Sequence, residues 1–165
     1  MGPTPFFRTA DGEVPQFYLA AKGGKEINMA IKQVSVFVEN KQGTLCVITD
    51  ALAKNGVDMK ALTLADTTDF GLMRMIVTDT DKAKDVLSEM GYLVKVNEVV
   101  AVEMENKPGA LSEAITALGE AGMNIEYLYA FIAVCGKNAR VVIRVDDNAK
   151  AEAILSAKGI SVVNE

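Results

Sequence analysis

The first regular pattern in the chain is an alternation of apolar and polar residues over residues 33–39. Every second position is a valine: Val34, Val36 and Val38. A period of two is typical of a strand, so this segment is predicted to be one. Residues 40–43 then favour a turn.

A helical pattern follows the turn. Apolar residues spaced by three and four define its predicted inward face: Leu45, Ile48, Ala51 and Leu52. Thr44 is predicted to cap the start of this helix, and Asn55 with Gly56 to end it in the left-handed conformation. The pattern therefore predicts one short amphipathic helix.

Two strands, a second helix and a further strand complete the first half of the chain. Apolar runs of strand length at 59–65 and 72–78 flank a hairpin connection, residues 79–81 open a helix, and 92–96 form a strand. The order β-α-β-β-α-β is that of a ferredoxin-like sandwich. The predicted fold class is α+β, with antiparallel sheets that carry helices on one face.

The second half repeats this order after a shift of 66 positions. The segment 38–45 returns as 104–111, and no insertion is needed before Gly56 meets its counterpart Gly122. The predicted elements are strands at 99–105, 125–134, 139–145 and 160–163, and helices at 110–121 and 148–157. Self-similarity of this kind indicates one supersecondary unit used twice.

The repeat divides the chain into an N-terminal extension (1–30), a first unit (31–97) and a second unit (98–165). Only Asn97 and Glu98 separate the strands of the two units, so their joint is expected to be rigid. A unit of this size buries only about 60% of its unfolded surface. The units are therefore expected to dock, either within one chain or across a dimer.

The N-terminal extension differs from the repeat and contains three of the four prolines. Its stretch 16–21 is apolar enough to add an edge strand. Alternatively, the native chain begins at Met29, because the codons for residues 22–24 allow a ribosome-binding sequence just upstream. Both interpretations stay open.

Composition and charge narrow the class of partner. The net charge is -5 and the pI is near 4.9, which argues against a nucleic-acid partner, since such surfaces need clustered Lys and Arg. No apolar run approaches the roughly 18–20 residues that cross a bilayer, and no signal peptide is evident. A cytoplasmic protein without a membrane partner is expected.

The chain lacks the usual means of catalysis. It has no histidine, so the commonest general base and metal ligand is missing. Cys46 and Cys135 have no metal-ligand spacing, and no phosphate loop, dinucleotide fingerprint or nucleophile elbow is found. We expect no catalytic residue, no metal and no cofactor.

Each unit carries the same pair of motifs. A Glu-Asn-Lys-(Gln/Pro)-Gly-x-Leu turn precedes Gly-(Val/Met)-(Asp/Asn)-(Met/Ile) in both copies. With two copies in register, the chain resembles the ACT domain family over residues 31–165. It looks like the small stand-alone proteins made of two ACT domains in tandem.

The resemblance implies regulation by a small ligand, usually an amino acid, bound where two ACT units meet. The residues support this independently, because Gly43 and Gly109 leave backbone N–H groups at a helix N-terminus open to a carboxylate. In ACT dimers the strand after the first helix supplies acceptors for the ammonium group. Asp58 and Asn124 are the polar candidates there, and a cationic amine would prefer Asp58.

The candidate ligand-binding residues of the first copy are Asn40, Gln42, Gly43, Thr44, Leu45, Val57, Asp58 and Met59. Those of the second copy are Asn106, Pro108, Gly109, Ala110, Leu111, Met123, Asn124 and Ile125. Proline is usual in the family where Gln42 stands, so the preferred groove combines residues 106–111 with Asp58.

Purely structural interpretations stay open beside these. The two glycines could serve only the turn, and Asp58 and Asn124 could simply begin strands. Arg74 and Arg140 are predicted on the face opposite the helices, in ion pairs. Tyr127 and Tyr129 share a face and either line a pocket or pack across strands.

Three functions are compatible with the sequence. The first is a regulatory protein that senses an effector and controls an enzyme of amino-acid metabolism, as a homodimer or an intrachain pseudo-dimer. The second is an assembly module in which paired edge strands make a continuous sheet. The third is a small enzyme.

Overall fold

The computed structural model describes residues 30–66, 69–132 and 137–163. Its elements in chain order are β1 (Ile31–Glu39), α2 (Thr44–Lys54), β2 (Met59–Asp66), β3 (Phe70–Val77), α3 (Thr80–Glu89), β4 (Val94–Glu105), α4 (Ala110–Glu120), β5 (Ile125–Ala130), β6 (Asn138–Val145), α5 (Asn148–Ala157) and β7 (Ser161–Val162). The α+β fold with two ferredoxin-like units is confirmed. The predictions for residues 16–21, Met29 and Cys135 fall outside the described residues.

Each unit has the strand order of a ferredoxin-like sheet. The first unit has the order β2-β3-β1-β4 and the second has β7-β4-β6-β5, with every pair antiparallel. Strand β4 belongs to both sheets. Its first half pairs with β1, and its second half pairs with β6 and β7.

The strands predicted at 92–96 and 99–105 are in fact one continuous strand, β4. The ladder does not stop at the expected joint, because Asn97 pairs with Gln33 and Glu98 with Lys32. The connection between the units is therefore a hydrogen-bonded strand and not a linker. Within the chain, the units share this strand and do not place edge strands side by side. The division of the chain at residues 97 and 98 stays a prediction.

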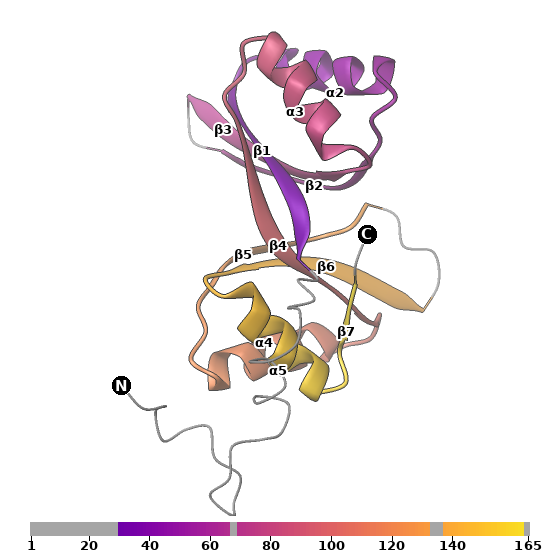
Figure 1. Cartoon of the computed structure of the whole chain (residues 1–165), viewed down its shortest axis with the longest axis vertical. Coiled ribbons are helices and arrows are strands. Elements are labelled where there is room, and N and C mark those ends of the chain that lie inside the picture. The colour runs from indigo at the N-terminus through magenta and orange to yellow at the C-terminus, as the bar shows by residue number, and fades with distance from the viewer. Residues whose placement is uncertain (1–29, 67–68, 133–136, 164–165) are drawn as a thin grey trace, which may run out of the picture.

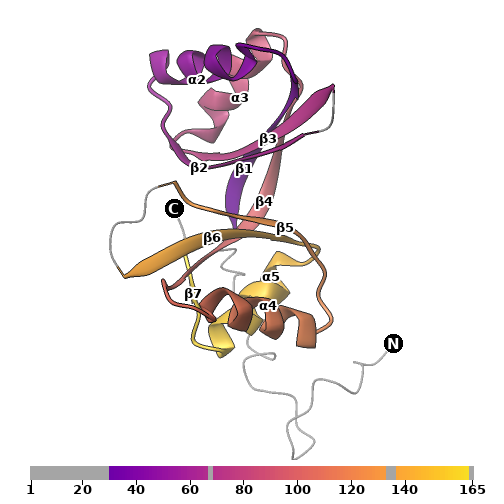
Figure 2. The ribbon, with the colours of Figure 1, turned by 180° about the vertical axis from the view of Figure 1, so that it is seen from behind.

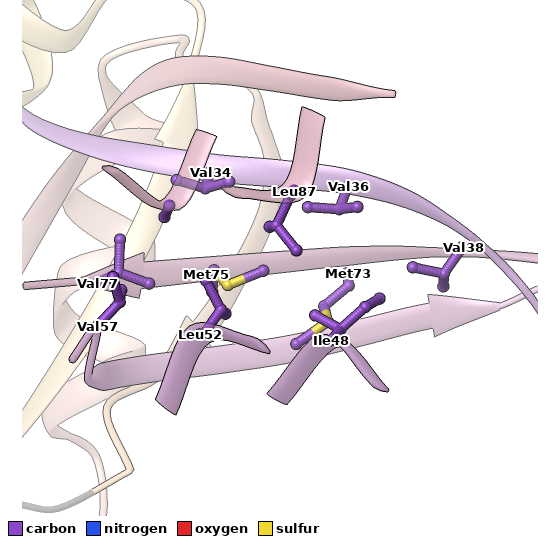
Figure 3. Packing of buried hydrophobic residues seen from close by; sticks show 11 residues of the cluster. Val34, Val36, Val38, Ile48, Leu52, Val57, Met73, Met75, Val77 and Leu87 are labelled. Carbon is purple, nitrogen blue, oxygen red and sulfur yellow. The ribbon is translucent and has the colours of Figure 1, made fainter. Parts of the chain in front are cut away.

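The core of the first unit lies between its sheet and its helices. Figure 3 shows the valines of β1 and the methionines of β3 pointing to the side from which Ile48, Leu52 and Leu87 approach. Ile48 and Leu52 are fully buried, as the helical spacing predicted. A matching core in the second unit is built around Leu118 and Leu155. These two cores fix the helices on one face of each sheet.

The start of α2 differs from the prediction in two ways. Gly43, and not Thr44, is the N-cap residue, because the turn ends in the left-handed conformation with a φ of 88° at Gly43. Leu45 is 42% exposed, because it stands in the first turn, ahead of the buried residues Ile48 and Leu52. The predicted end of the helix is confirmed, with Asn55 as C-cap and Gly56 at positive φ.

Other boundaries moved by a few residues. The strand predicted at 125–134 ends as β5 at Ala130, after which Phe131 forms a single bridge to Ala61 of β2. The strand predicted at 160–163 is reduced to the two residues of β7. None of the helices in the described ranges has the length and hydropathy of a membrane span.

The two units meet through the sheet faces that their helices leave uncovered. Figures 1 and 2 show α2 and α3 outside one sheet and α4 and α5 outside the other, with both sheets between them. An apolar cluster joins the faces: Ile31, Ala61, Ile76, Val99, Ala101, Tyr129 and Val142. The expected docking of the units thus takes place within one chain, in four layers.

Candidate functional site

The two glycine turns have the same geometry. Gly43 and Gly109 are the N-cap residues of α2 and α4, with φ values of 88° and 95°. In each turn the lysine N–H donates to the preceding glutamate carbonyl at 2.9 Å, and the first helical N–H donates to the lysine carbonyl at 3.3 Å. The repeat in sequence is thus a repeat in structure at the candidate site.

The turns are open to solvent. A Cβ atom added to Gly43 or Gly109 would have no heavy atom within 4 Å. Glycine is therefore required by the positive φ and not by crowding. The first N–H groups of α2 and α4 have no acceptor within their own helices, so these ends favour an anion.

Charged side chains flank each turn. Lys41 forms an ion pair with Glu39 at 2.7 Å, and Lys107 pairs in the same way with Glu105. The hydrogen bond from Lys107 lowers the pKa of Glu105, and the pair raises the pKa of Lys107. The turns differ in one respect, since the first turn of α4 contains Glu113 and that of α2 contains no acid.

Asp58 and Asn124 stand at the beginnings of β2 and β5, where both are exposed. The N–H of Asp58 donates to Thr78 Oγ1, and its carbonyl accepts from the N–H of Thr78, both at 3.0 Å. Their neighbours Val57 and Met123 are buried in the two cores. The polar side chains are thus presented outward by apolar anchors beside them.

The turn and the strand start of one unit lie at opposite ends of its sheet. Glu39, just before the first turn, is opposite Phe70, whereas Met59 is opposite Val77 at the other end of β3. The start of β2 instead lies against the end of β5, where the N–H of Ile132 donates to the Lys60 carbonyl at 2.8 Å. A groove that combines a turn with a strand start therefore needs two units.

The preferred groove, residues 106–111 with Asp58, stays a prediction. Among the described residues, no hydrogen bond or ion pair joins Asp58 to the segment 106–111. Both glycine turns follow the strand ends that lie farthest from the middle of β4, where the units meet. Each turn is therefore presented at an outer end of its unit.

A buried polar cluster between the units was missed by the sequence prediction. Gln33 is fully buried, and its amide donates to Ser35 Oγ at 3.0 Å and to the Tyr127 hydroxyl at 2.8 Å. The Tyr129 hydroxyl donates to Gln33 Oε1 at 2.8 Å. The guanidinium carbon of Arg74 lies 4.0 Å from the centre of the Tyr127 ring. The sequence signal for this cluster is the presence of Gln33 and Ser35 between the valines of β1. Alternation places them on the face opposite the valines, but it does not predict what covers that face.

The arginines and tyrosines of the two sheets make different kinds of contact. Arg140 forms the predicted ion pair, with Nε 2.6 Å from Glu103 Oε2, whereas Arg74 stacks on Tyr127. The two tyrosines are packing residues at the contact between the units. Burial raises the pKa of the Tyr129 phenol above its ordinary range.

One further hollow lies on the outer surface of the second unit. It has a volume of about 380 Å³ and is lined by Ser112, Glu113, Thr116, Ala117, Glu120, Lys158 and Ile160. Most of its lining is exposed, and Lys158 lies 4.0 Å from Glu120. None of the sequence-predicted site residues is part of it. Within the described ranges, no group of three His, Cys, Asp or Glu residues is placed to hold a metal ion.

The turns, the doubled βαββαβ unit and the strand order define a pair of ACT domains. The family model of the ACT domain pair matches residues 29–165, and the chain belongs to this family. The resemblance noted in the sequence is thereby confirmed. A search of curated proteins finds no match.

Solved structures share the fold over most of the chain. The protein BT0572 from Bacteroides thetaiotaomicron is 37% identical with a TM-score of 0.76, and the match covers 82% of this chain and 92% of that one. The ligand-free regulatory subunit of aspartate kinase from Thermus thermophilus is 18% identical with a TM-score of 0.61, covering 78% and 90%. The corresponding subunit from Thermus flavus gives 19%, 0.55 and the same coverage. The aspartate kinase subunits therefore share the fold of this chain.

Proposed function

We propose that this chain is a regulatory protein that binds a small effector, an amino acid, at the glycine turn before α4. The observation that carries the proposal is the exposed turn at Gly109, where backbone and helix N-terminus face open space. The ligand carboxylate would accept from the N–H groups of Leu111 and Ser112, since the Ala110 N–H already donates to the Lys107 carbonyl. Glu113 and Asp58 are the candidate acceptors for its ammonium group.

The free energy that the turn alone supplies is too small to bind an effector tightly. An exposed helix N-terminus stabilises an anion by about 0.3–1 kcal/mol, whereas micromolar binding needs about 8 kcal/mol. A second surface must therefore cover the ligand and exclude water. We propose that a second copy of the chain supplies it through residues 57–59, because among the described residues no hydrogen bond or ion pair joins Asp58 to the turn of its own chain.

The regulated target is proposed to be an enzyme of amino-acid metabolism. Two solved structures of this fold are regulatory subunits of aspartate kinase, which makes the same kind of role reasonable here. Catalysis by the chain itself is the less favoured alternative, since the sequence has no histidine. A cytoplasmic location fits this role and stays a prediction.

A thermal-shift screen of the twenty amino acids tests the proposal. A ligand present at 100 times its dissociation constant should stabilise the protein by about 2.7 kcal/mol. We expect one amino acid, or a small related group, to raise the melting temperature. If none of them does so, the assembly interpretation is favoured, and turnover of any candidate would favour the enzyme.

A further inference from the structure

Apolar side chains remain exposed on the first sheet, on the face that the second unit covers only in part. Nearest the second unit, Ile31 and Ile76 are buried against it. Farther along the same face, Phe37 is 50% exposed and Phe70 is 58% exposed. Leu93, just before β4, is 68% exposed.

Leu93, Phe37 and Leu72 lie side by side across the strands, and Phe70 lies two positions before Leu72 on β3. Phe37 is the register partner of Leu72, and its N–H donates to the Leu93 carbonyl at 3.1 Å. Their valine and methionine neighbours Val36 and Met73 point toward the helices, so by alternation the row points away from them (Figure 3). We call Phe37, Phe70, Leu72 and Leu93 the apolar row.

The second unit is built differently at the same place. The shift of 66 positions puts Glu103 where Phe37 stands and Asn138 where Leu72 stands. Glu103 accepts from Arg140 Nε at 2.6 Å and from Asn138 Nδ2 at 2.8 Å. The polar side chains on that face tolerate exposure to solvent. The side chains of the apolar row have no group that can form a hydrogen bond with water.

We propose that the apolar row is a homodimer interface, in which the row of one chain packs on the row of a second copy. A second copy is the proposed occupant because the apolar row continues a sheet face whose inner half already packs on an ACT sheet within the chain. A second copy offers two outer sheet faces. Packing on the face of the second unit would remove the Glu103–Arg140 ion pair from water. The other face is the apolar row itself.

Packing of like on like is the arrangement that a twofold interface requires. The Lys41–Glu39 ion pair lies beside the row, since Glu39 is the register partner of Phe70, and it would form a polar rim. This dimer does not depend on an effector. Its failure and the failure of the effector proposal are therefore separate results.

Sedimentation velocity of the full chain over a range of concentrations tests the interface. We expect a species of twice the 17.7 kDa chain mass at micromolar concentration. The double variant Phe37→Glu, Leu72→Asn copies the second unit into the first. It should raise the dissociation constant about 30-fold or more, as loss of an interface hot spot does.

A matched control removes apolar surface elsewhere. Val47 on α2 is 51% exposed, and Val47→Glu should leave the dimer unchanged. Circular dichroism checks that the variants fold. If the double variant does not fold, Leu93→Glu serves as a second disrupting change. A wild-type chain that stays monomeric overturns the proposal. In that case residues 1–29 or another protein would be the occupant of the row. The proposal is also overturned if the dimer survives both disrupting changes or if Val47→Glu dissociates it equally.

Discussion

Conformation at single residues sets the candidate site. Gly43 and Gly109 hold a backbone conformation that costs other residues roughly 1–2 kcal/mol, although space around both is open. A side chain at Gly109 would not crowd the turn, because an added Cβ atom meets no heavy atom within 4 Å. A substitution there should act by turning the backbone N–H groups away from the ligand.

Gly109→Ala tests this at the residue scale, with Gly122→Ala as its matched control. Gly122 also has positive φ and open surroundings, but it ends α4 instead of starting it. Both variants should lose about 1 kcal/mol of stability. Only Gly109→Ala should weaken, by tenfold or more, the binding of the amino acid found in the screen, as measured by calorimetry. Equal affinities in the two variants would move the site away from this turn.

Tyr129 links residue chemistry to the contact between the units. Its hydroxyl donates to buried Gln33, and burial raises the pKa of the phenol above its ordinary value of about 10. The folded state therefore holds this proton more firmly than the unfolded state does. The stability that this provides is fully present below about pH 10 and is lost as pH rises beyond it.

Tyr129→Phe should consequently have two effects. It leaves Gln33 Oε1 buried without its partner, which should cost about 1–3 kcal/mol near neutral pH. It should also make the free energy of unfolding fall less steeply above about pH 10. Urea unfolding at a neutral and an alkaline pH measures both. Parallel pH profiles for variant and wild type would contradict the argument.

At the scale of elements, helix ends are set by local side chains. The Asp79 carboxylate accepts from the N–H of Lys82 at 3.0 Å, and Asp147 caps α5 in the same way. Asp79→Ala should cost about 1 kcal/mol of stability. Asp85→Ala removes an exposed acid from the middle of the same helix, so it should change stability less. Denaturant unfolding compares them, and equal losses would argue against the cap.

These local elements are what the sequence could predict. Alternation in β1, the spacing of Ile48 and Leu52, and the Asn55-Gly56 stop all act within a few residues. Burial of Gln33 was not predictable in this way, because the residues that cover it are more than ninety positions away. The continuity of β4 through Asn97 likewise depends on pairing with β1. The glycine turns were predictable, but not the partner that would complete a groove.

The whole molecule is a four-layer sandwich in which one strand serves two sheets (Figure 1). Because β4 and the apolar cluster between the units hold them together, both glycine turns are kept at the outer ends. If a second copy covers the turn, as proposed, the effector acts between molecules. Ligand binding is expected to strengthen association through that contact, which is separate from the apolar row.

Hydrogen–deuterium exchange of the full chain, with and without the amino acid that gives the largest thermal shift, tests the central claim directly. We predict slower exchange in two separate segments, residues 106–112 and 57–59. Protection confined to residues 116–120 and 158–160 of the outer hollow, or to the contact between the two units, would contradict an effector site at the glycine turn.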